Sequence, residues 1–370
     1  MNDLFPPSIH IPSKVICQKG GLFGLAAELK EYGAKGIIVH GPSFEKSGIK
    51  EKLFGNLSSA GLKPEFFCRG NGEASLSEID TVIKQGRKSK ALWITGIGGG
   101  SVLDLAKAAA GLFNAVEKPV YYQEGGSLTE KGIPFVAVPT TAGSGSEATS
   151  NAVIINPDKK LKLSIRHKSF LAEKVILDIE LLKNAPRTVK IHSGMDALLQ
   201  AYESFISRNA TEFTDGLALR AVEMISSHIV PAVEKNDDES LHAMLVGSFF
   251  AGIAFSHSRL GVVHGIAHPL GVLYDVPHGL VCAACFIPSL KLNRKAMGDK
   301  YPRLTRAVKM DFTKKIEHLL RAFGIKSPFK GNPVAEEEKI IAETLNSGST
   351  AANPKPITYE DVKFILKEIF

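Results

Sequence analysis

Asp196 and Gln200 lie four residues apart in the stretch GMDALLQAYESF, Gly194 to Phe205. On a helix, side chains at this spacing project from one face, one turn apart. A carboxylate and an imidazole at this spacing would be two ligands of a metal ion, but here the second residue is an amide. Whether this face holds a metal therefore depends on ligands that other parts of the chain supply.

A group of histidines in GVVHGIAHPLGVLYDVPHG offers such ligands. His264, His268 and His278 fall within fifteen residues of a chain that has 11 His. A single histidine on an apolar face is usually a core residue and not a ligand. Three histidines in a segment interrupted by Gly and Pro favour a role as ligands. Imidazole is the commonest transition-metal ligand, and two His with one carboxylate leave positions open for substrate. Asp196 is the best candidate for the carboxylate, although the spacing does not show that the two segments meet.

The segment ALWITGIGGGSVLDLAK is typical of a strand, a glycine turn and a helix. Gly98, Gly99 and Gly100 have no Cβ, so the backbone can approach a pyrophosphate, and the N–H groups of a helix that begins at Ser101 point at the anion. Ser101 and Asp104 also fit a capping box, in which each side chain satisfies a free backbone donor. This does not exclude a role at the phosphate, and we expect both among the cofactor-binding residues. The run is not a strict G-x-G-x-x-G, because Ser101 stands at its last position. It predicts a nucleotide site of moderate specificity.

Two further loops point to the same kind of ligand. VPTTAGSGSEAT places the hydroxyls of Thr140, Thr141 and Ser144 after a predicted strand, where ligands bind in open α/β sheets. The loop after GIIVH contains Gly41 and Ser43 and no acidic residue before position 45. An acidic residue there would bind the ribose 2′-hydroxyl and repel a 2′-phosphate. We therefore expect NAD(P), with NADP slightly favoured and Ser43 as a donor to its phosphate.

The elements that must position these residues change in type along the chain. Predicted strands at 15–17, 36–40, 64–68, 91–96, 134–139 and 151–155 alternate with predicted helices at 22–32, 77–88 and 101–113. This alternation predicts βαβ units around a mostly parallel sheet. From about Val189 the pattern is that of successive amphipathic helices. We expect an α/β NAD(P)-binding domain over residues 1–185 and an all-helical, metal-binding and catalytic domain over residues 186–370.

Composition bounds the class of protein. With 370 residues, 44% hydrophobic and 22% charged, the chain is long enough for two domains. The net charge of +7 is scattered without a long basic run, so we expect no nucleic-acid partner. No signal-peptide pattern and no stretch of about 20 apolar residues is evident, so we expect a cytoplasmic protein without a membrane partner. Cys282 and Cys285 form a C-x-x-C in an apolar run, which favours buried thiols over a zinc or redox site.

Four motifs, in order, resemble the iron-containing (group III) alcohol dehydrogenase family: GGGSVLDLAK, PTTAGSGSEAT, GMDALLQAYES and HGIAHPLGVLYDVPHG. The resemblance covers nearly the whole chain. It implies the dehydroquinate synthase-like fold, with an N-terminal dinucleotide-binding α/β domain, an all-helical C-terminal domain and an active site in the cleft between them. It also implies NAD(P) at the glycine loop and a divalent metal, Fe²⁺ or Zn²⁺, that polarises the alcohol or carbonyl oxygen. A homodimer is common among such proteins and is expected here.

Residue by residue, the resemblance assigns the metal ligands to Asp196, His264 and His278. His268 matches a residue beside the substrate that assists proton transfer. The residues that match cofactor-binding positions are Gly99, Gly100, Ser101, Thr140, Thr141 and, near the ribose, Lys162. Gln200 departs from the family, whose iron-binding members carry a His there as fourth ligand, so we expect a weak ligand and a weakly held metal. His192, one turn before Asp196, is a second departure, for which we expect a polar contact near the helix start.

The function implied is reversible hydride transfer between NAD(P)(H) and a small alcohol, aldehyde or ketone. One alternative is a metal-poor homologue that binds nucleotide with little turnover, which Gln200 favours. Another is a dehydroquinate-synthase-like, NAD- and metal-dependent lyase. Such a lyase needs a Lys/Arg cluster to bind a phosphorylated substrate, and we assign no such cluster in the helical half of the sequence.

Overall fold

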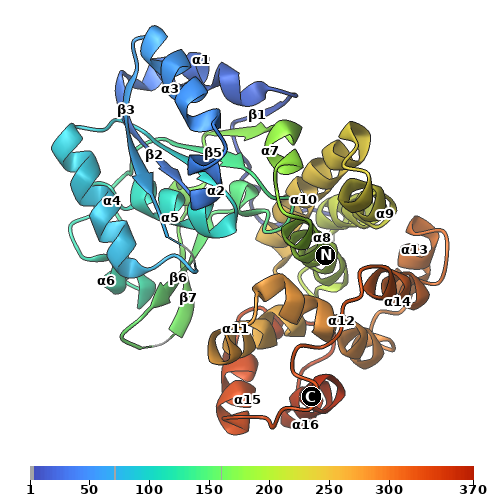
Figure 1. The fold of residues 1–370 in the computed structure, drawn as a ribbon. Helices are drawn as coiled ribbons and strands as arrows, with labels where there is room; N and C mark the ends of the chain where they lie inside the picture. The colour runs from blue at the N-terminus through green and yellow to red at the C-terminus, as the bar shows by residue number, and fades with distance from the viewer. Residues whose placement is uncertain (1–3, 71, 160) are drawn as a thin grey trace. The chain divides into compact units, whose positions relative to one another are not determined.

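The computed structural model describes residues 4–70, 72–159 and 161–370, and the chain divides into two compact units. The α/β unit comprises His10–Thr141 and Ser146–Ala185. The helical unit comprises Pro186–Phe370, the short segment Ala142–Gly145 and the described residues up to Ile9. The main division falls after Ala185 (Figure 1). The segment Ala142–Gly145 belongs to the helical unit although it lies in the first half of the sequence.

Six strands of the α/β unit form one parallel sheet, which confirms the predicted fold class. The order across the sheet is β1 (Lys14–Cys17), β8 (Lys174–Leu177), β5 (Phe135–Pro139), β4 (Ile94–Gly98), β2 (Lys35–His40) and β3 (Lys63–Cys68). Every residue of β4 and β5 is buried. A strand covered by helices on both faces is expected to be apolar along its whole length.

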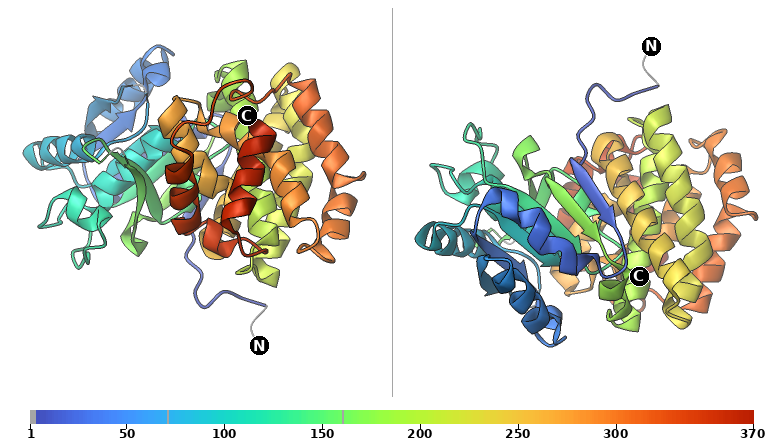
Figure 2. Two further views of the ribbon diagram at one scale, coloured as in Figure 1. Left: turned by 90° about the horizontal axis from the view of Figure 1, so that it is seen from below. Right: turned by 90° about the horizontal axis from the view of Figure 1, so that it is seen from above.

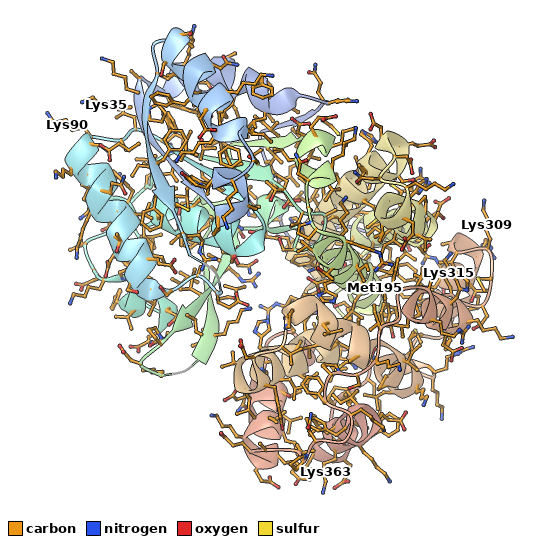
Figure 3. The ribbon with its side chains drawn as sticks, viewed as in Figure 1. Lys35, Lys90, Met195, Lys309, Lys315 and Lys363 are labelled. Atoms are coloured by element: carbon orange, nitrogen blue, oxygen red, sulfur yellow. The ribbon has the colours of Figure 1, made fainter. Side chains whose placement is uncertain are left out.

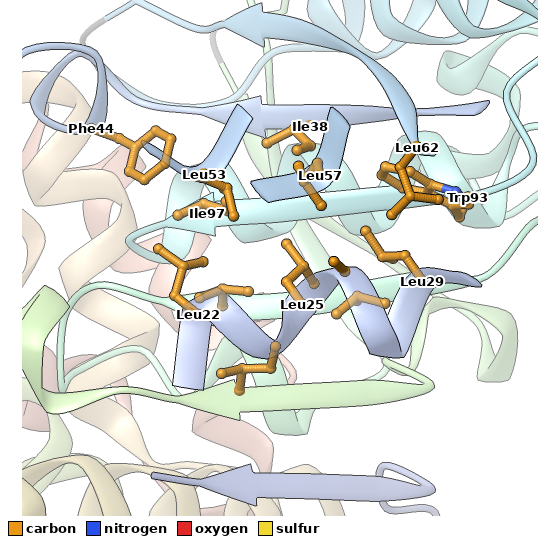
Figure 4. Packing of buried hydrophobic residues seen from close by; sticks show 14 of the residues in the cluster. Leu22, Leu25, Leu29, Ile38, Phe44, Leu53, Leu57, Leu62, Trp93 and Ile97 are labelled. Atoms are coloured by element: carbon orange, nitrogen blue, oxygen red, sulfur yellow. The ribbon is translucent and has the colours of Figure 1, made fainter. Parts of the chain in front are cut away.

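Successive residues of one strand contact helices on opposite faces of this sheet. Ile38 of β2 belongs to a buried cluster that includes Trp93, Leu25 of α1 (Leu25–Leu29) and Leu57 of α3 (Ile49–Ser59) (Figure 4). Ile37 lies instead near Gly86 of α4 (Leu76–Ser89), which packs on the same side as α5 (Gly100–Gly111) (Figure 2). The two-residue period of a strand therefore supplies both cores.

Several elements differ from the sequence prediction. The predicted helix 22–32 is divided into η1 (Gly21–Gly24), α1 and η2 (Lys30–Tyr32). Glycine at both ends of η1 disfavours a continuous α-helix there. Strand β6 (Asn151–Asn156) pairs antiparallel with β7 (Leu161–Arg166) in a separate two-stranded sheet. The α/β unit also contains the short helices α2 (Pro42–Glu45), α6 (Pro119–Gln123) and α7 (Ile179–Lys183). The short 3₁₀ turns η3 (Ser146–Ala148) and η4 (Lys168–Phe170) complete it.

The helical unit confirms the prediction of an all-α second half. Its helices are α8 (Arg187–Ile206), α9 (Glu212–Glu234), α10 (Asp238–Ser258), α11 (Val262–Tyr274), α12 (His278–Asn293), α13 (Lys300–Ala307), α14 (Phe312–Ala322), α15 (Glu337–Asn346) and α16 (Tyr359–Ile369), with the 3₁₀ turn η5 (Thr350–Ala352). Helix α8 packs against α9, α10 and α12, so its residues from Gly194 to Ile206 are all buried. Polar side chains on this helix therefore need partners inside the unit.

Helices α9 and α10 are long and apolar enough to cross a bilayer by length and composition alone. The expectation that no stretch approaches this length was therefore wrong. In α10, 67% of the most apolar window is buried, and the helix packs against α8 and α9. A helix that is apolar around its whole circumference is expected where other helices surround it in a core.

Candidate active site

Three polar residues lie along one face of α8. Asp196, Gln200 and Glu203 follow the spacing i, i+4 and i+7, and their exposed fractions are 6%, 4% and 0%. Met195, which is labelled in Figure 3 and is fully buried, marks this position on α8. Burying an ionised carboxylate costs free energy unless hydrogen-bond donors or cations face it. The partners of Asp196 and Glu203 therefore define the site.

Helix α11 supplies His264, whose ring lies between the two carboxylates. His264 Nδ1 donates to Glu203 Oε2 at 2.7 Å, and His264 Nε2 lies 3.2 Å from Asp196 Oδ1. Burial would lower the pKa of His264, but the hydrogen bonds to Asp196 and Glu203 outweigh it and raise that pKa to about 9. A carboxylate behind one ring nitrogen fixes the tautomer and directs the other nitrogen into the site.

Glu203 also joins α8 to the start of α11. The backbone N–H groups of Gly261 and Val263 each donate to its carboxylate at 2.8 Å. The first N–H groups of a helix have no partner within the helix, and the helix dipole stabilises an anion there. Glu203 therefore positions His264 both through its ring and through the backbone that carries it.

Helix α12 brings two more donor atoms to Asp196. His278 Nε2 lies 3.8 Å from Asp196 Oδ1, and Cys282 Sγ lies 3.5 Å from His278 Nε2. Asp196, His264, His278 and Cys282 each offer one ligand atom, and these four atoms all lie within 4.8 Å of one another. The structure thus brings together the three predicted ligands from segments nearly seventy residues apart, with a thiol beside them. Oxygen, nitrogen and sulfur donors in such a group suit a transition metal.

Gln200 contacts Asp196 through its amide. Gln200 Nε2 donates to Asp196 Oδ2 at 3.0 Å, while Gln200 Oε1 is buried and has no hydrogen-bond partner among the described residues. The amide therefore holds the carboxylate oxygen that faces away from His264. A buried oxygen without a donor is costly, and a bound cation or water would remove that cost. The residues present consequently fit a metal site.

In the α/β unit, the glycine loop has an open helix N-terminus. Strand β4 ends at Gly98, and Gly99 is the N-cap of α5, with no side chain bonded to the first N–H groups of the helix. The N–H of Thr140 donates to Gly98 O at 3.0 Å. A Cβ on Gly99 would lie 3.4 Å from Thr141 Oγ1. Uncapped N–H groups at the carboxyl ends of two neighbouring strands are suited to a phosphate.

Comparison with known proteins identifies the family. The iron-containing alcohol dehydrogenase family model matches residues 12–179, and the model of the C-terminal region of that family matches residues 190–370. The chain belongs to the iron-containing alcohol dehydrogenase family. It is an oxidoreductase that uses NAD(P) and a divalent metal to interconvert alcohols and carbonyl compounds.

Relatives match this family member over nearly its full length. An NAD-dependent methanol dehydrogenase of Bacillus methanolicus is 31% identical, over 97% of this chain and 99% of that protein. A lactaldehyde reductase of Escherichia coli (strain K12) is also 31% identical, over 93% of this chain and 94% of its own. The solved structure of an alcohol dehydrogenase from Oenococcus oeni has a TM-score of 0.93 and 26% identity, covering 98% and 100% of the two chains.

One prediction about the glycine loop of this dehydrogenase was wrong. Ser101 and Asp104 do not form a capping box, because α5 begins at Gly100 and Gly99 is its cap. Asp104 is buried instead, where Oδ1 accepts from Ser146 Oγ at 2.5 Å and Oδ2 accepts from the N–H of Val153 at 3.0 Å. Burial raises the pKa of Asp104. These contacts make Asp104 a support of the segment after β5 and do not favour its predicted contact with the cofactor.

The remaining predicted cofactor residues of the dehydrogenase lie in different places. Gly41 is the N-cap of α2, and a Cβ there would lie 3.5 Å from Val102 of α5, so it borders the glycine loop. Ser43 is exposed on α2. Lys162 Nζ forms an ion pair with Glu73 at 2.7 Å. Ser144 belongs to the helical unit, where its neighbour Gly143 would meet Ser193 of α8 if it carried a Cβ.

The other histidines of the dehydrogenase have distinct surroundings. The ring of His268 lies beside that of His278, with centroids 5.5 Å apart, and is partly buried. His192 lies in the second turn of α8, outside the group of four ligand atoms. Burial lowers the pKa of His192. The polar contact near the helix start that we expected for His192 stays a prediction.

Sequence reasoning missed three residues of these sites. Glu203 follows Asp196 at i+7, and Cys282 follows His278 at i+4, so helical spacing contained a signal for both. The predicted burial of Cys282 and Cys285 is confirmed, since both are buried free thiols, but Cys282 also belongs to the ligand group. Arg69, which follows β3, is buried and donates through Nη1 to Ser101 Oγ at 2.8 Å. No sequence pattern pointed to Arg69.

Proposed function

We propose that Asp196, His264 and His278 hold the divalent metal of this oxidoreductase. The observation that carries the proposal is their convergence inside the helical unit, with the Glu203 carboxylate behind His264. When bound, the cation supplies the Lewis acidity that polarises an alcohol or carbonyl oxygen. Glu203 holds the imidazole of His264 in one tautomer, and Gln200 holds the second oxygen of Asp196. Two ligand side chains are thus oriented before metal arrives, which lowers the cost of binding it.

The glycine loop is the proposed site of the NAD(P) pyrophosphate. The uncapped N-terminus of α5 at Gly99 and the neighbouring Thr140 and Thr141 support this assignment. NAD(P) supplies the hydride chemistry, while the chain binds and orients it. The Arg69 guanidinium adds positive charge beside Ser101, balanced in part by Glu78, whose Oε1 lies 3.4 Å from Arg69 Nε. We propose that NADP is slightly preferred, because a glycine stands at position 41 and Ser43 is available for a 2′-phosphate.

His268 is the proposed proton carrier. An imidazole has a pKa near neutrality, so its ring nitrogen can accept the hydroxyl proton of an alcohol and return it during carbonyl reduction. The position of the His268 ring beside that of His278 supports this role. The substrate class is a small alcohol with its aldehyde or ketone. A cytoplasmic location stays a prediction of the sequence pattern, and a homodimer stays a prediction of the resemblance.

A paired assay tests the function. Purified protein is loaded with Fe²⁺ or Zn²⁺ and offered NADPH or NADH with a panel of small aldehydes and ketones. We expect cofactor oxidation with at least one of them, and faster turnover with NADPH. Tight cofactor binding without oxidation in any combination would favour the metal-poor, nucleotide-binding alternative. Gln200 is the residue that favours this alternative. Metal analysis of Asp196→Ala and His278→Ala tests the ligands, and unchanged metal content in both would refute them.

A further inference from the structure

The donor atoms around Asp196 have the separations of a metal coordination shell. In a tetrahedral zinc site with ordinary bond lengths, nitrogen and oxygen ligands lie about 3.4 Å apart, and nitrogen and sulfur ligands about 3.6 Å apart. The Asp196 Oδ1 distances to His264 Nε2 and His278 Nε2 are 3.2 and 3.8 Å, and Cys282 Sγ lies 3.5 Å from His278 Nε2. The distance of 3.8 Å is too long for a hydrogen bond between nitrogen and oxygen. These three separations match such a shell, and all four atoms lie within 4.8 Å of one another.

Gln200 leaves the fourth position to another residue. Its amide places the NH₂ group against Asp196 Oδ2, and the reverse orientation would set two oxygens against each other. In this arrangement the amide nitrogen of Gln200 holds Asp196 Oδ2 and cannot serve as a metal ligand. Cys282 lies one turn after His278 on α12, inside the group, and is fully buried.

From these contacts we propose that Cys282 is the fourth protein ligand, as a thiolate, of a site completed by Asp196, His264 and His278, and that this donor set favours Zn²⁺ over Fe²⁺. The inference rests on the proposed metal site and adds a ligand and a metal preference to it. Thiolate is a soft ligand, and soft ligands select zinc over iron(II) among divalent ions of the first row. Zinc can expand to five ligands, so a fourth protein ligand does not close the site.

The charge balance of the thiol requires the metal. Cys282 is fully buried, and burial disfavours a charged sulfur, so a thiolate here needs a cation beside it. A divalent cation supplies the charge that stabilises the thiolate. On binding, the S–H bond breaks, sulfur donates its electron pair to the cation and the proton passes to solvent. Binding at neutral pH therefore releases about one proton from this ligand.

Cys285 provides a matched control. It lies three residues after Cys282 on the same helix and is also a fully buried free thiol. It does not belong to the group of ligand atoms. Replacing either residue by serine removes one buried sulfur from α12, so the two variants share the packing effect and differ in the proposed ligand. Exposed Cys17 and Cys68 are present in both.

The experiment is a titration of the metal-free, full-length chain with Co²⁺, which reports thiolate ligation through a near-ultraviolet charge-transfer band. Wild type, Cys282→Ser, Cys285→Ser and Asp196→Ala are compared without cofactor or substrate. We expect the band in wild type and Cys285→Ser. Cys282→Ser should lose the band and bind Co²⁺ at least about tenfold more weakly than wild type. Competition with Zn²⁺ and Fe²⁺ should show a smaller preference for Zn²⁺ in Cys282→Ser than in Cys285→Ser. Circular dichroism checks that each variant is folded.

The outcomes separate the two levels of the proposal. If wild type and Cys282→Ser bind Co²⁺ equally, with the same spectrum, while Asp196→Ala does not bind it, the metal site stands and the thiolate ligand is refuted. If Asp196→Ala binds Co²⁺ as wild type does, the band comes from another thiol, and both the proposed site and this inference are refuted. Absence of binding in wild type refutes both as well.

Discussion

Glu203 accepts a hydrogen bond from His264 Nδ1 at 2.7 Å while the first N–H groups of α11 donate to the same carboxylate. Glu203→Gln keeps the shape but places an NH₂ group among donors. We expect metal affinity to fall roughly 10- to 100-fold, because the ring of His264 loses its orienting acceptor. Isothermal titration with Zn²⁺ measures this. Glu223→Gln, an exposed residue paired with Arg220, is the control, and equal affinities in both variants would contradict the role of Glu203.

Gln200→His should strengthen retention of Fe²⁺ by about tenfold, because it adds an imidazole nitrogen where the amide of Gln200 only holds Asp196 Oδ2. The iron content that remains after chelator treatment is the measurement. Gln200→Met has a similar volume and no strong ligand, and it also loses the hydrogen bond to Asp196 Oδ2. We expect Gln200→Met to retain less iron than wild type. Equal retention in the two variants would show that position 200 does not reach the metal.

Gly279→Ala should weaken metal binding without removing a ligand. A Cβ at this position would lie 2.3 Å from the backbone oxygen of His192 on α8. Helix α12 must then move, and His278 at its start moves away from Asp196. Such overpacking costs about 1–3 kcal/mol, and we expect a lower thermal midpoint together with at least about tenfold weaker Zn²⁺ affinity.

Gly216→Ala is the control for this substitution. Gly216 lies in α9 with nothing within 4 Å of an added Cβ, so alanine should stabilise the chain by about 0.4–1 kcal/mol. Differential scanning calorimetry and Zn²⁺ titration of both variants test the comparison. If Gly279→Ala bound zinc as tightly as Gly216→Ala, the close approach of α8 and α12 would not matter for the site.

Gly41→Asp should change the cofactor preference from NADPH to NADH. The added carboxylate repels a 2′-phosphate and accepts a hydrogen bond from a 2′-hydroxyl. The position tolerates a side chain, since its Cβ would be at an ordinary contact distance of 3.5 Å from Val102. We expect the NADPH-to-NADH ratio of kcat/KM to fall by about tenfold or more, from a loss of roughly 1.4 kcal/mol or more. An unchanged ratio would mean that the ribose lies elsewhere.

Glu147→Gln should change the pH dependence of stability. Burial raises the pKa of Glu147 from 4.5 to about 7, although Lys107 opposes this. Between these values the unfolded chain has lost the proton and the folded chain still holds it, so stability falls as pH rises through this window and stays lower above it. The difference corresponds to roughly 3 kcal/mol. The variant has no carboxyl to ionise at this position. The thermal midpoint of the variant minus that of wild type should therefore be larger at pH 8 than at pH 5.

Glu117→Gln serves as the control for Glu147→Gln, because Glu117 is exposed in the same unit. We expect its thermal midpoint to follow that of wild type at both pH values. The interpretation would be wrong if Glu147→Gln also showed the same difference from wild type at pH 5 and pH 8.

Local pattern predicted the two main parts of the architecture. The alternation of β-type runs with helical periods predicted the parallel sheet, and the change to a helical period predicted the second unit, because each depends on which face of an element is apolar. The strand, glycine turn and helix around Gly98 and Gly99 were also predictable. Glycine at a strand end acts through the missing Cβ of that residue alone. The capping box failed because the helix begins before Ser101, at Gly100. Gly99 adopts an extended conformation, which moves the helix start and leaves Asp104 directed into the interior.

The sequence by itself determined which residues were capable of binding a metal, and the tertiary structure decided which of them lie together. Asp196, His264 and His278 were recognisable by type, spacing and resemblance. These three residues meet because α8, α11 and α12 pack at particular crossing angles. Side chains along the whole length of each helix set those angles. The same packing turned Gln200 onto Asp196 and brought Cys282 into the group. Residue type and spacing are local properties of the sequence. Contact between distant segments is set by the packing of all the side chains in the core.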